Sequence, residues 1–260
     1  MQYPNDDPDS TEILATRLPG GPPNGADPLD AGALLGRYRL QSLLGRGGMG
    51  EVYLAEQLEP VRRTVALKLL RSRRLEARHL AYFEVERQLL AQMRHPAIAQ
   101  IYDAGATMEG FPFFAMEYIE GSPVTRFCDE QRLPLRQRIE LFIRICEGVQ
   151  HAHQKGVIHR DLKPGNILVD NVDGRALPKI IDFGIATAAS RSMDGEGQER
   201  VGTPAYMSPE QAGGDATAID TRSDVYSLGV LLYELLTGQR PDAAGKAIEA
   251  SNQQPPLPSN

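Results

Sequence analysis

The segment HRDLKPGN, residues 159–166, gathers three side chains whose chemistry suits the movement of a phosphate to a hydroxyl group. Asp161 can accept the proton of an attacking hydroxyl, and Lys163 can steady the phosphate that moves. The amide oxygen of Asn166 is a suitable ligand for a hard cation. A helical pattern ends before this segment and the apolar run ILV follows it, which predicts a loop at a domain cleft.

A second candidate metal ligand lies 16 residues after Asn166. Asp182 opens the tripeptide DFG and follows the strand pattern KII. An isolated DFG carries almost no information. Here it supplies a carboxylate where a cation held by Asn166 needs another oxygen ligand.

The segment GRGGMGEV, residues 45–52, can bring backbone N–H groups close to phosphate oxygens. Its glycines at positions 45, 47 and 50 lack the Cβ that would hinder such an approach. A dinucleotide-binding turn would be followed by a helix, whereas a strand pattern follows here. A glycine-rich hairpin without a ligand stays open as the alternative for this pattern taken alone.

Lys68 is the candidate partner for such phosphates. It lies 18 to 23 residues after the three glycines and shares a strand face with Ala66, whose small side chain leaves room for a flat purine. Glu86 occupies the inward face of a predicted helix and would supply the opposite charge, because burying either charge alone is costly. An exposed lysine at a strand edge is the alternative, which the inward Glu86 disfavours.

The elements that must position these residues change type near residue 121. Alternating or clustered apolar residues predict five strands, at residues 37–45, 51–56, 64–70, 99–105 and 111–120. One helix over residues 80–93 joins them through an apolar stripe of Leu80, Phe83, Leu90 and Met93. The fold class is therefore α+β, with a small five-stranded antiparallel lobe and a larger helical lobe.

Two helices dominate the predicted second lobe. The first covers residues 134–156 and ends at Gly156, with an apolar stripe of Ile139, Phe142, Ile143, Cys146 and Val149. The second covers residues 223–238 and is apolar almost all round, so we expect it to be buried, with Gly238 ending it.

Composition excludes several classes of protein. The 260 residues carry a net charge of -6, and residues 1–36 alone hold six acidic residues against one arginine. The remainder is nearly neutral, which does not favour nucleic-acid binding. Cys128 and Cys146 suggest neither a disulfide framework nor a metal clip. The sequence shows no signal peptide or membrane span, so we expect a cytoplasmic segment, and anchoring through a segment beyond Asn260 stays open.

Seven motifs occur together across residues 37–240: GRGGMGEV, VALK, Glu86, HRDLKPGN, DFG, GTPAYMSPE and SDVYSLGVLLYELLTG. In this order they resemble the bacterial Hanks-type serine/threonine protein kinases. Lys163 and the GTPAYMSPE segment match the serine/threonine form rather than the tyrosine form. The resemblance implies ATP with Mg²⁺, Mn²⁺ being a possible substitute, and protein Ser/Thr hydroxyls as acceptors, including those of the chain itself.

The resemblance also implies residue roles. Lys68, paired with Glu86, would hold the α- and β-phosphates, while Asp161 would be the catalytic base and Lys163 would assist it. Asn166 and Asp182 would hold the metal. Residues implied to surround ATP are Leu44, Gly45, Arg46, Gly47, Gly48, Met49, Gly50, Val52, Ala66, Lys68, Met116, Glu117, Tyr118 and Leu168. Among these, Val52, Ala66 and Leu168 would enclose adenine, Met116 would be the gatekeeper, and the backbone of residues 117 and 118 would bond the purine edge.

Regulation is expected to involve Arg160, which precedes the catalytic aspartate in the subgroup controlled by a phosphorylated loop. Ser190 and Ser192 are the candidate phosphorylation sites, whereas Thr203 matches a threonine that bonds near the catalytic aspartate. Two alternatives stay open: acidic residues at positions 196 and 199 substituting for phosphate, and a flexible acidic loop without a regulatory role.

The chain also departs from the family pattern. Ser208 replaces an alanine, and residues 239–260 lack the long amphipathic patterns of the helices that the family has there. The predicted organisation is therefore an acidic, Pro/Gly-rich disordered leader over residues 1–36, a small lobe over 37–116, a hinge over 117–121 and an incomplete large lobe over 122–260. An exposed apolar surface on the 223–238 helix is expected to follow. Glu210 should lack its usual arginine partner.

Two further functions stay open beside the active kinase. An ATP-binding scaffold would use the fold for interaction only, and a truncated lobe would leave the chain inactive. The intact catalytic positions disfavour the scaffold. A small-molecule kinase is disfavoured by GTPAYMSPE, which resembles a protein-substrate docking segment. The sequence does not predict the protein substrate, the stimulus or the oligomeric state.

Overall fold

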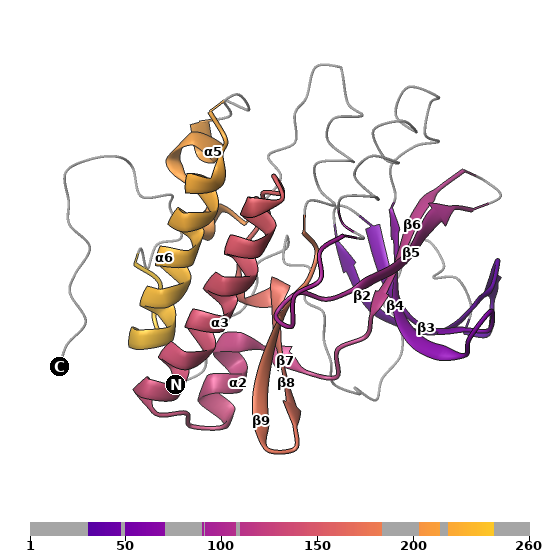
Figure 1. The fold of residues 1–260 in the computed structure, drawn as a ribbon, viewed down its shortest axis with the longest axis horizontal. Coiled ribbons are helices and arrows are strands. Elements are labelled where there is room, and N and C mark those ends of the chain that lie inside the picture. The colour runs from indigo at the N-terminus through magenta and orange to yellow at the C-terminus, as the bar shows by residue number, and fades with distance from the viewer. Residues whose placement is uncertain are drawn as a thin grey trace.

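The computed structural model describes residues 31–47, 50–70, 90, 92–107, 110–183, 203–213 and 218–241. Figure 1 shows a strand-rich lobe, formed by the earlier part of the chain, beside a helical lobe formed by the later part. The predicted bilobal α+β fold is confirmed. Several predicted features lie outside the described residues: most of the 80–93 helix with Glu86, the Gly48–Met49 pair, Ser190, Ser192, and nearly all of the leader and the last 22 residues.

The small lobe contains an antiparallel sheet in the order β1-β2-β3-β4-β6-β5. Its strands are β1 (Leu34–Leu35), β2 (Tyr38–Gly47), β3 (Gly50–Gln57), β4 (Arg63–Leu70), β5 (Ile101–Ala106) and β6 (Pro112–Glu117). The five predicted strands are all present. The count of five was wrong by one, because the chain before Arg37 folds back on β2, with Leu35 opposite Tyr38. Gly36 makes this turn possible, since its φ of +57° is strained for other residues.

The two faces of β4 belong to different cores. Val65 and Leu67 are fully buried in a cluster on one side of the sheet. Ala66 belongs to the main core on the other side, where Lys68 is also buried. The predicted separation of these residues onto two faces is therefore confirmed, and it directs Lys68 toward the interior between the lobes.

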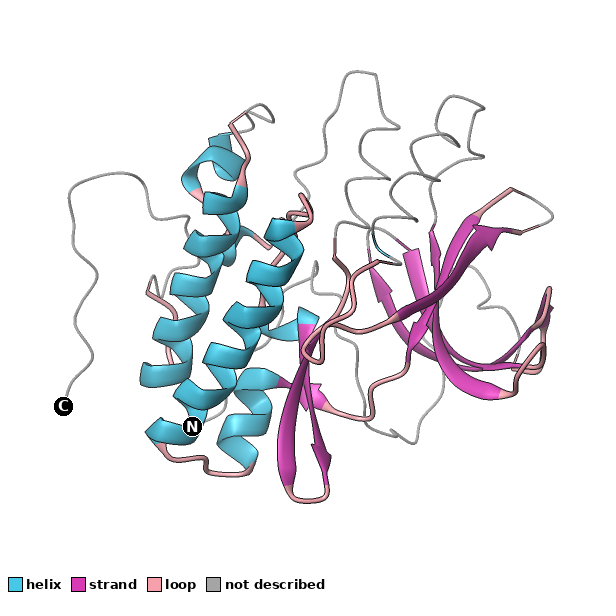
Figure 2. Cartoon of the chain, in the orientation of Figure 1, coloured by secondary structure: helices cyan, strands magenta, loops and turns pink. Residues whose placement is uncertain are grey.

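The sheet curls so strongly that strands far apart in its order make contact. β2 lies near one edge and β5 forms the other, yet Arg37 and Tyr38 each donate a 2.6 Å hydrogen bond to the carboxylate of Asp103 in β5. The Tyr38 ring also meets Phe113 edge-on, with centroids 5.6 Å apart. The curled shape is visible in Figure 2. Because the sheet is curled in this way, β2, β3 and β4 together line the small-lobe side of the region between the lobes.

A second, three-stranded sheet begins the large lobe. It pairs β7 (Ser122–Pro123) with β8 (Ile167–Val172) and β8 with β9 (Arg175–Ile180), all antiparallel. The 3-10 turn η1 (Pro164–Asn166) precedes β8, and Asp182 follows β9 by two residues. The hairpin of β8 and β9 therefore joins the 159–166 loop to the DFG segment. At its open end, the N–H of Ile181 donates a 2.9 Å hydrogen bond to the carbonyl of Asn166.

The helices of the large lobe are α2 (Val124–Glu130), α3 (Leu135–Gln154), α5 (Pro209–Gly213) and α6 (Thr221–Thr237), with the 3-10 turn η2 (Pro204–Tyr206) before α5. The predicted helices over 134–156 and 223–238 are confirmed within two residues at each end. Asp220 caps α6 by accepting from the N–H of Arg222, and Gly238 ends it in the left-handed conformation.

The predicted inward stripe of α3 was partly wrong. Leu141, Ile145 and Val149 are buried, whereas Ile139 and Ile143 are 38% and 51% exposed. Phe142 and Cys146 of the predicted stripe do pack against the core. The apolar residues of α3 allow more than one stripe at helical spacing, and the positions of β9 and α6 decide which one is covered.

The expectation that α6 is buried on all sides was also wrong in part. Leu231 and Leu235 are buried, but Val225 is 60% exposed and Gly229 is exposed as well. Among the described residues of α6, Val225 is therefore the one large apolar side chain that is clearly exposed.

Candidate active site

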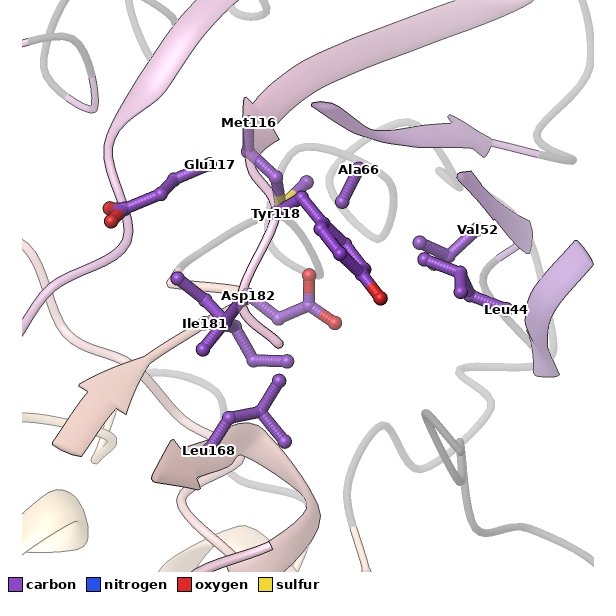
Figure 3. Close-up of a pocket in the computed structure, with 10 residues that line it drawn as sticks. Leu44, Val52, Ala66, Met116, Glu117, Tyr118, Leu168, Ile181 and Asp182 are labelled. Atoms are coloured by element: carbon purple, nitrogen blue, oxygen red, sulfur yellow. The ribbon is translucent and has the colours of Figure 1, made fainter. Parts of the chain in front are cut away.

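An apolar pocket lies between the two lobes (Figure 3). The small lobe contributes β2, β3, β4 and β6, and the large lobe contributes β8 and the residues before the DFG phenylalanine. The pocket is lined by Leu44, Val52, Ala66, Met116, Glu117, Tyr118, Ile119, Leu168, Ile181 and Asp182. About 420 Å³ of empty space lies within it, part of it open to solvent. Eight of these ten were singled out from the sequence.

Ile119 and Ile181 are the two lining residues that sequence reasoning missed. Ile181 lies directly before Asp182 in the KII strand signal, so its neighbours did mark it. Ile119 lies between β6 and β7 and belongs to a small buried cluster with Leu168 and Ile181. Residue 119 falls within the predicted 111–120 strand and the predicted hinge, but no role in the pocket was predicted for it, so only the fold reveals this contact.

The peptide groups at the edge of the pocket are partly engaged within the protein. The N–H of Glu117 donates to the carbonyl of Gln100 at 2.8 Å. A purine edge would therefore have to meet the carbonyl of Glu117 or the peptide of Tyr118, and not this N–H. The backbone contact to adenine expected at residues 117 and 118 is therefore limited to those groups.

Lys68 forms an ion pair with Asp182, with Nζ 2.7 Å from Oδ2. The two side chains are only 4% and 10% exposed. Because burying either charge alone would be costly, each charged group offsets the cost of burying the other. Glu86, the partner predicted from the sequence, lies outside the described residues, so the observed partner of Lys68 is the carboxylate of the DFG segment.

The 159–166 loop folds around the carboxylate of Asp161. Asn166 donates from its amide nitrogen to Asp161 Oδ2 at 2.9 Å and to the Asp161 carbonyl at 2.7 Å. Lys163 Nζ lies 3.1 Å from Asp161 Oδ2 and donates to Thr203 Oγ1 at 2.8 Å. The N–H of Thr203 donates to Asp161 Oδ1 at 3.2 Å. The structure thus brings together four residues that the sequence had marked, one of them 42 positions away from Asp161.

Asp224 of α6 holds the same loop from beneath. Its carboxylate accepts from the N–H groups of His159 and Arg160 at 2.9 and 2.8 Å, and lies 2.7 Å from His153 Nε2. Burial opposes ionisation of Asp224, but its hydrogen bonds with His153 and with the backbone N–H groups of His159 and Arg160, together with the electrostatic effect of His159, outweigh burial and lower its pKa. The sequence placed Asp224 in a shared motif but gave no sign of this contact.

Two residues beside the site adopt a backbone conformation that favours glycine. Arg160 has φ +69° and Asp182 has φ +62°. The ring of Phe183 lies against that of His159, with centroids 4.7 Å apart and the ring planes tilted by 57°, and this contact joins the DFG segment to the loop. Left-handed residues at both points show that the surrounding contacts, rather than local preference, determine the backbone. The expected regulatory role of Arg160 is not tested by these contacts.

The candidate metal ligands offer oxygen atoms. Because the amide nitrogen of Asn166 makes both hydrogen bonds to Asp161, the amide oxygen is the atom suited to a cation. Asp182 supplies a carboxylate, which already meets one positive charge from Lys68. An amide oxygen with a carboxylate fits a hard divalent ion such as Mg²⁺.

The glycine-rich segment forms the predicted hairpin between β2 and β3, with Gly47 opposite Gly50. Gly50 has φ +148°, and a Cβ there would lie 2.1 Å from the carbonyl oxygen of Leu69. Glycine at this position is therefore required for packing against β4, a reason beyond the approach to phosphate. Arg46 pairs with Glu51 across the hairpin at 3.0 Å.

Glu210 has a partner of a different kind from the arginine expected in the family. It accepts a 2.6 Å hydrogen bond from Ser223, which lowers its pKa despite burial. Nearby, Tyr206 donates to Glu234 at 2.5 Å. Burial raises the pKa of both Tyr206 and Glu234, the tyrosine bond only partly offsetting this effect for the carboxyl group.

The curled sheet, the helical lobe and the pocket between them define a bilobal kinase fold. Comparison with known proteins agrees: the protein kinase domain family matches residues 38–255. The chain belongs to this family. The family implies ATP as a substrate together with a divalent metal ion, and its serine/threonine members act on proteins.

Named relatives are bacterial. Serine/threonine-protein kinase PknB of Mycobacterium leprae is 39% identical over 225 residues, covering 84% of this chain and 35% of that protein. Serine/threonine-protein kinase pkn3 of Myxococcus xanthus is 37% identical over 235 residues, covering 86% and 42%. The chain thus spans 35% to 42% of the length of these curated relatives.

Among solved structures, the Mycobacterium tuberculosis PknI kinase domain superposes with a TM-score of 0.66 at 27% identity, covering 88% of this chain and 82% of that one. A single-substitution mutant of the same domain gives a TM-score of 0.64 at 26% identity, covering 83% and 80%. Within the described ranges, no helix is both long enough and apolar enough to cross a bilayer.

Proposed function

We propose that this chain is a serine/threonine protein kinase that transfers the γ-phosphate of Mg-ATP to Ser/Thr hydroxyls of proteins, including its own. The observation that carries the proposal is the convergence of Lys163, Asn166 and Thr203 on the carboxylate of Asp161. A carboxylate held in this way is oriented to accept a proton from an approaching hydroxyl.

The remaining roles follow from position and charge. Adenine would enter the apolar pocket, between Ala66 and Val52 on one side and Leu168 on the other. Lys68 is buried next to Asp182 of the pocket lining, and its positive charge would bind the α- and β-phosphates. The glycine-rich hairpin would cover the phosphates from above. These assignments make positioning and electrostatics the main sources of rate enhancement.

Asn166 and Asp182 would hold Mg²⁺, which supplies positive charge to the phosphate oxygens. Asp161 would take the proton of the acceptor hydroxyl, and Lys163 would donate to the moving phosphate while remaining bonded to Thr203. Because Lys163 contacts both Asp161 and Thr203, it links the proton acceptor to the 203–208 segment.

Organisation and regulation are part of the proposal. We place the kinase domain over residues 37–260, with a small lobe to about residue 116 and a hinge over 117–121, after an acidic leader. Phosphate on Ser190 or Ser192, or acidic residues of the same loop, would meet Arg160. Ser192→Ala enzyme that keeps full activity and carries no phosphate in the loop would exclude the serine as the regulatory site.

The test is transfer of labelled γ-phosphate from Mg-ATP to the chain itself and to a basic protein acceptor, compared with Asp161→Asn. We expect label on serine or threonine with the parent chain and a loss of about 10²- to 10⁴-fold in the variant, the range typical of a positioned general base. Absence of transfer by the parent chain, with ATP still raising its melting temperature, would refute kinase activity and favour a binding scaffold.

A further inference from the structure

Gln211 of α5 contacts the catalytic loop at Arg160, 51 positions earlier in the chain. Its side-chain amide nitrogen donates to the carbonyl of Arg160 at 2.7 Å. Its amide oxygen accepts from both the N–H and the hydroxyl of Ser208, at 3.2 and 3.1 Å. Gln211 is 9% exposed and Ser208 is fully buried.

These contacts determine which way the amide points. Reversing it would place the amide oxygen against the carbonyl oxygen of Arg160, two acceptors at hydrogen-bond distance. With the observed orientation each end of the amide has partners of the right kind. A buried amide held at both ends is fixed in position, since leaving either end unpaired would be costly.

The carbonyl that Gln211 holds belongs to the peptide bond between Arg160 and Asp161. The N–H of that same peptide donates to His159 Nδ1 at 3.2 Å. The preceding N–H, of Arg160, donates to Asp224. Gln211 therefore provides the contact on the carbonyl side of a peptide plane that leads directly to the carboxylate of Asp161.

The backbone at this point needs such support. Arg160 has φ +69°, a conformation that is unfavourable for any residue that carries a Cβ. It persists only when surrounding contacts impose it. Asp224 accepts a hydrogen bond from the N–H of Arg160, and Gln211 donates one to the carbonyl of Arg160. Releasing the carbonyl would let the peptide turn and carry Asp161 with it.

We infer that Gln211 is a positioning residue for phosphate transfer: it holds the Arg160–Asp161 peptide in the orientation that presents the Asp161 carboxylate, and through Ser208 it ties that peptide to residues 203–208. The inference rests on the proposed function. Gln211 is absent from the lining of the nucleotide pocket, so its effect should fall on the transfer step and not on nucleotide binding.

The serine at position 208 contributes to this arrangement. Alanine, which the family pattern has here, would keep the peptide N–H that bonds to Gln211 but lose the hydroxyl bond. Ser208→Ala should therefore produce a smaller effect than removal of the Gln211 amide, in the same direction.

The experiment compares Gln211→Glu, Gln211→Ala and Ser208→Ala with the parent chain. Gln211→Glu keeps the shape but replaces the donating nitrogen with oxygen. Gln150→Glu makes the same change of charge on the exposed side of α3 and serves as the matched control. For each variant, kcat, the KM for ATP, the Kd for ADP and the melting temperature are measured, with Asp161→Asn as the inactive reference.

We expect the Gln211 variants to lose about tenfold or more in kcat, as small displacements of a reacting group can do. The KM for ATP and the Kd for ADP should stay within about twofold, since the pocket is not touched. Ser208→Ala should lose about threefold, as expected for one of several hydrogen bonds. Gln150→Glu should match the parent chain.

Two results would overturn the inference. One is folded Gln211 variants that retain the parent kcat; the other is a loss of kcat matched by an equal loss of ADP affinity, which would show a general structural role. If neither Gln211 variant folds, Ser208→Ala decides, and an unchanged kcat there overturns the inference. Failure of the proposed function is distinguishable, because the parent chain itself would then transfer no phosphate while binding ADP.

Discussion

Glu117 and Lys179 form an ion pair that joins the two lobes beside the pocket. Nζ of Lys179, in β9, lies 2.8 Å from Oε1 and 2.9 Å from Oε2 of Glu117, at the end of β6. The same carboxylate accepts from the N–H of Gln100 at 3.1 Å. Figure 3 shows the Glu117 side chain directed away from the pocket that its backbone lines. The carboxylate thus connects the end of β6 to β9, the strand that leads to Asp182.

We expect this pair to stabilise the relative placement of the lobes. Lys179→Met should lower the free energy of unfolding, and a double-mutant cycle with Glu117→Gln should give a coupling of about 0.5–1 kcal/mol, because the side chains are 19% and 25% exposed. Chemical unfolding at low and high salt measures it. A coupling of zero at low salt would show that the pair contributes nothing.

Replacing Lys68 should have a larger effect on stability. Lys68→Met leaves the buried carboxylate of Asp182 without its cation, which typically costs about 3 kcal/mol or more. Adding Asp182→Asn removes that charge, so the double variant should regain part of the loss while both remain inactive. Urea unfolding distinguishes the two. A double variant less stable than Lys68→Met would contradict the ion-pair explanation.

Gly50 and Gly229 provide a matched comparison of glycine-to-alanine changes. Gly50→Ala should destabilise the chain by about 2–3 kcal/mol, because φ is +148° and the new Cβ would meet the Leu69 carbonyl at 2.1 Å. Gly229 lies on the exposed side of α6, and a Cβ added there would have no other atom within 4 Å. Gly229→Ala should raise stability by about 0.5–1 kcal/mol through helix propensity. Thermal unfolding reports both, and equal effects would contradict the packing argument.

The Tyr206–Glu234 pair predicts a specific pH dependence. Burial raises the pKa of Glu234 above 4.5, so the folded state binds a proton more readily than the unfolded state. The stabilising contribution of that group is present below pH 4.5 and is lost as pH rises through the folded-state pKa. Glu234→Gln should therefore melt at about the same temperature as the parent near pH ~4 and at a higher temperature at pH ~7.

Tyr206→Phe tests the same pair from the other side. It removes the hydrogen bond that partly stabilises the ionised carboxylate, so the loss in melting temperature should be greater at pH ~7 than at pH ~4. A pH-independent loss would show that the tyrosine acts through packing alone.

Much of the candidate site was predictable because its signals are local. Alternation along β4 placed Ala66 and Lys68 on one face, and the apolar patterns ILV and KII marked the segments beside Asn166 and Asp182. The glycine pattern predicted a hairpin between strands. Each of these inferences depends on residues within one or two neighbouring elements, where backbone geometry alone relates sequence separation to direction.

Other features depended on contacts between distant segments. The chain pattern of α3 allowed Ile139 and Ile143 to face inward, but β9 and α6 cover Leu141 and Ile145 instead. Likewise the short strand at Leu34 forms only because β2 is there to pair with it. Periodicity indicates that an apolar face exists; the packing partner decides which face is buried.

The sequence by itself determined the chemical groups of this protein, the order in which they occur and the elements that carry them. Only the tertiary structure decided how the 159–166 loop is held: Asp224 lies 63 positions after Asp161, Gln211 lies 50 positions after it, and neither shows a local pattern pointing to that loop. The physical reason is that hydrogen-bond partners of a strained peptide are chosen by proximity in space, and proximity arises when helices from the far end of the chain pack beneath it.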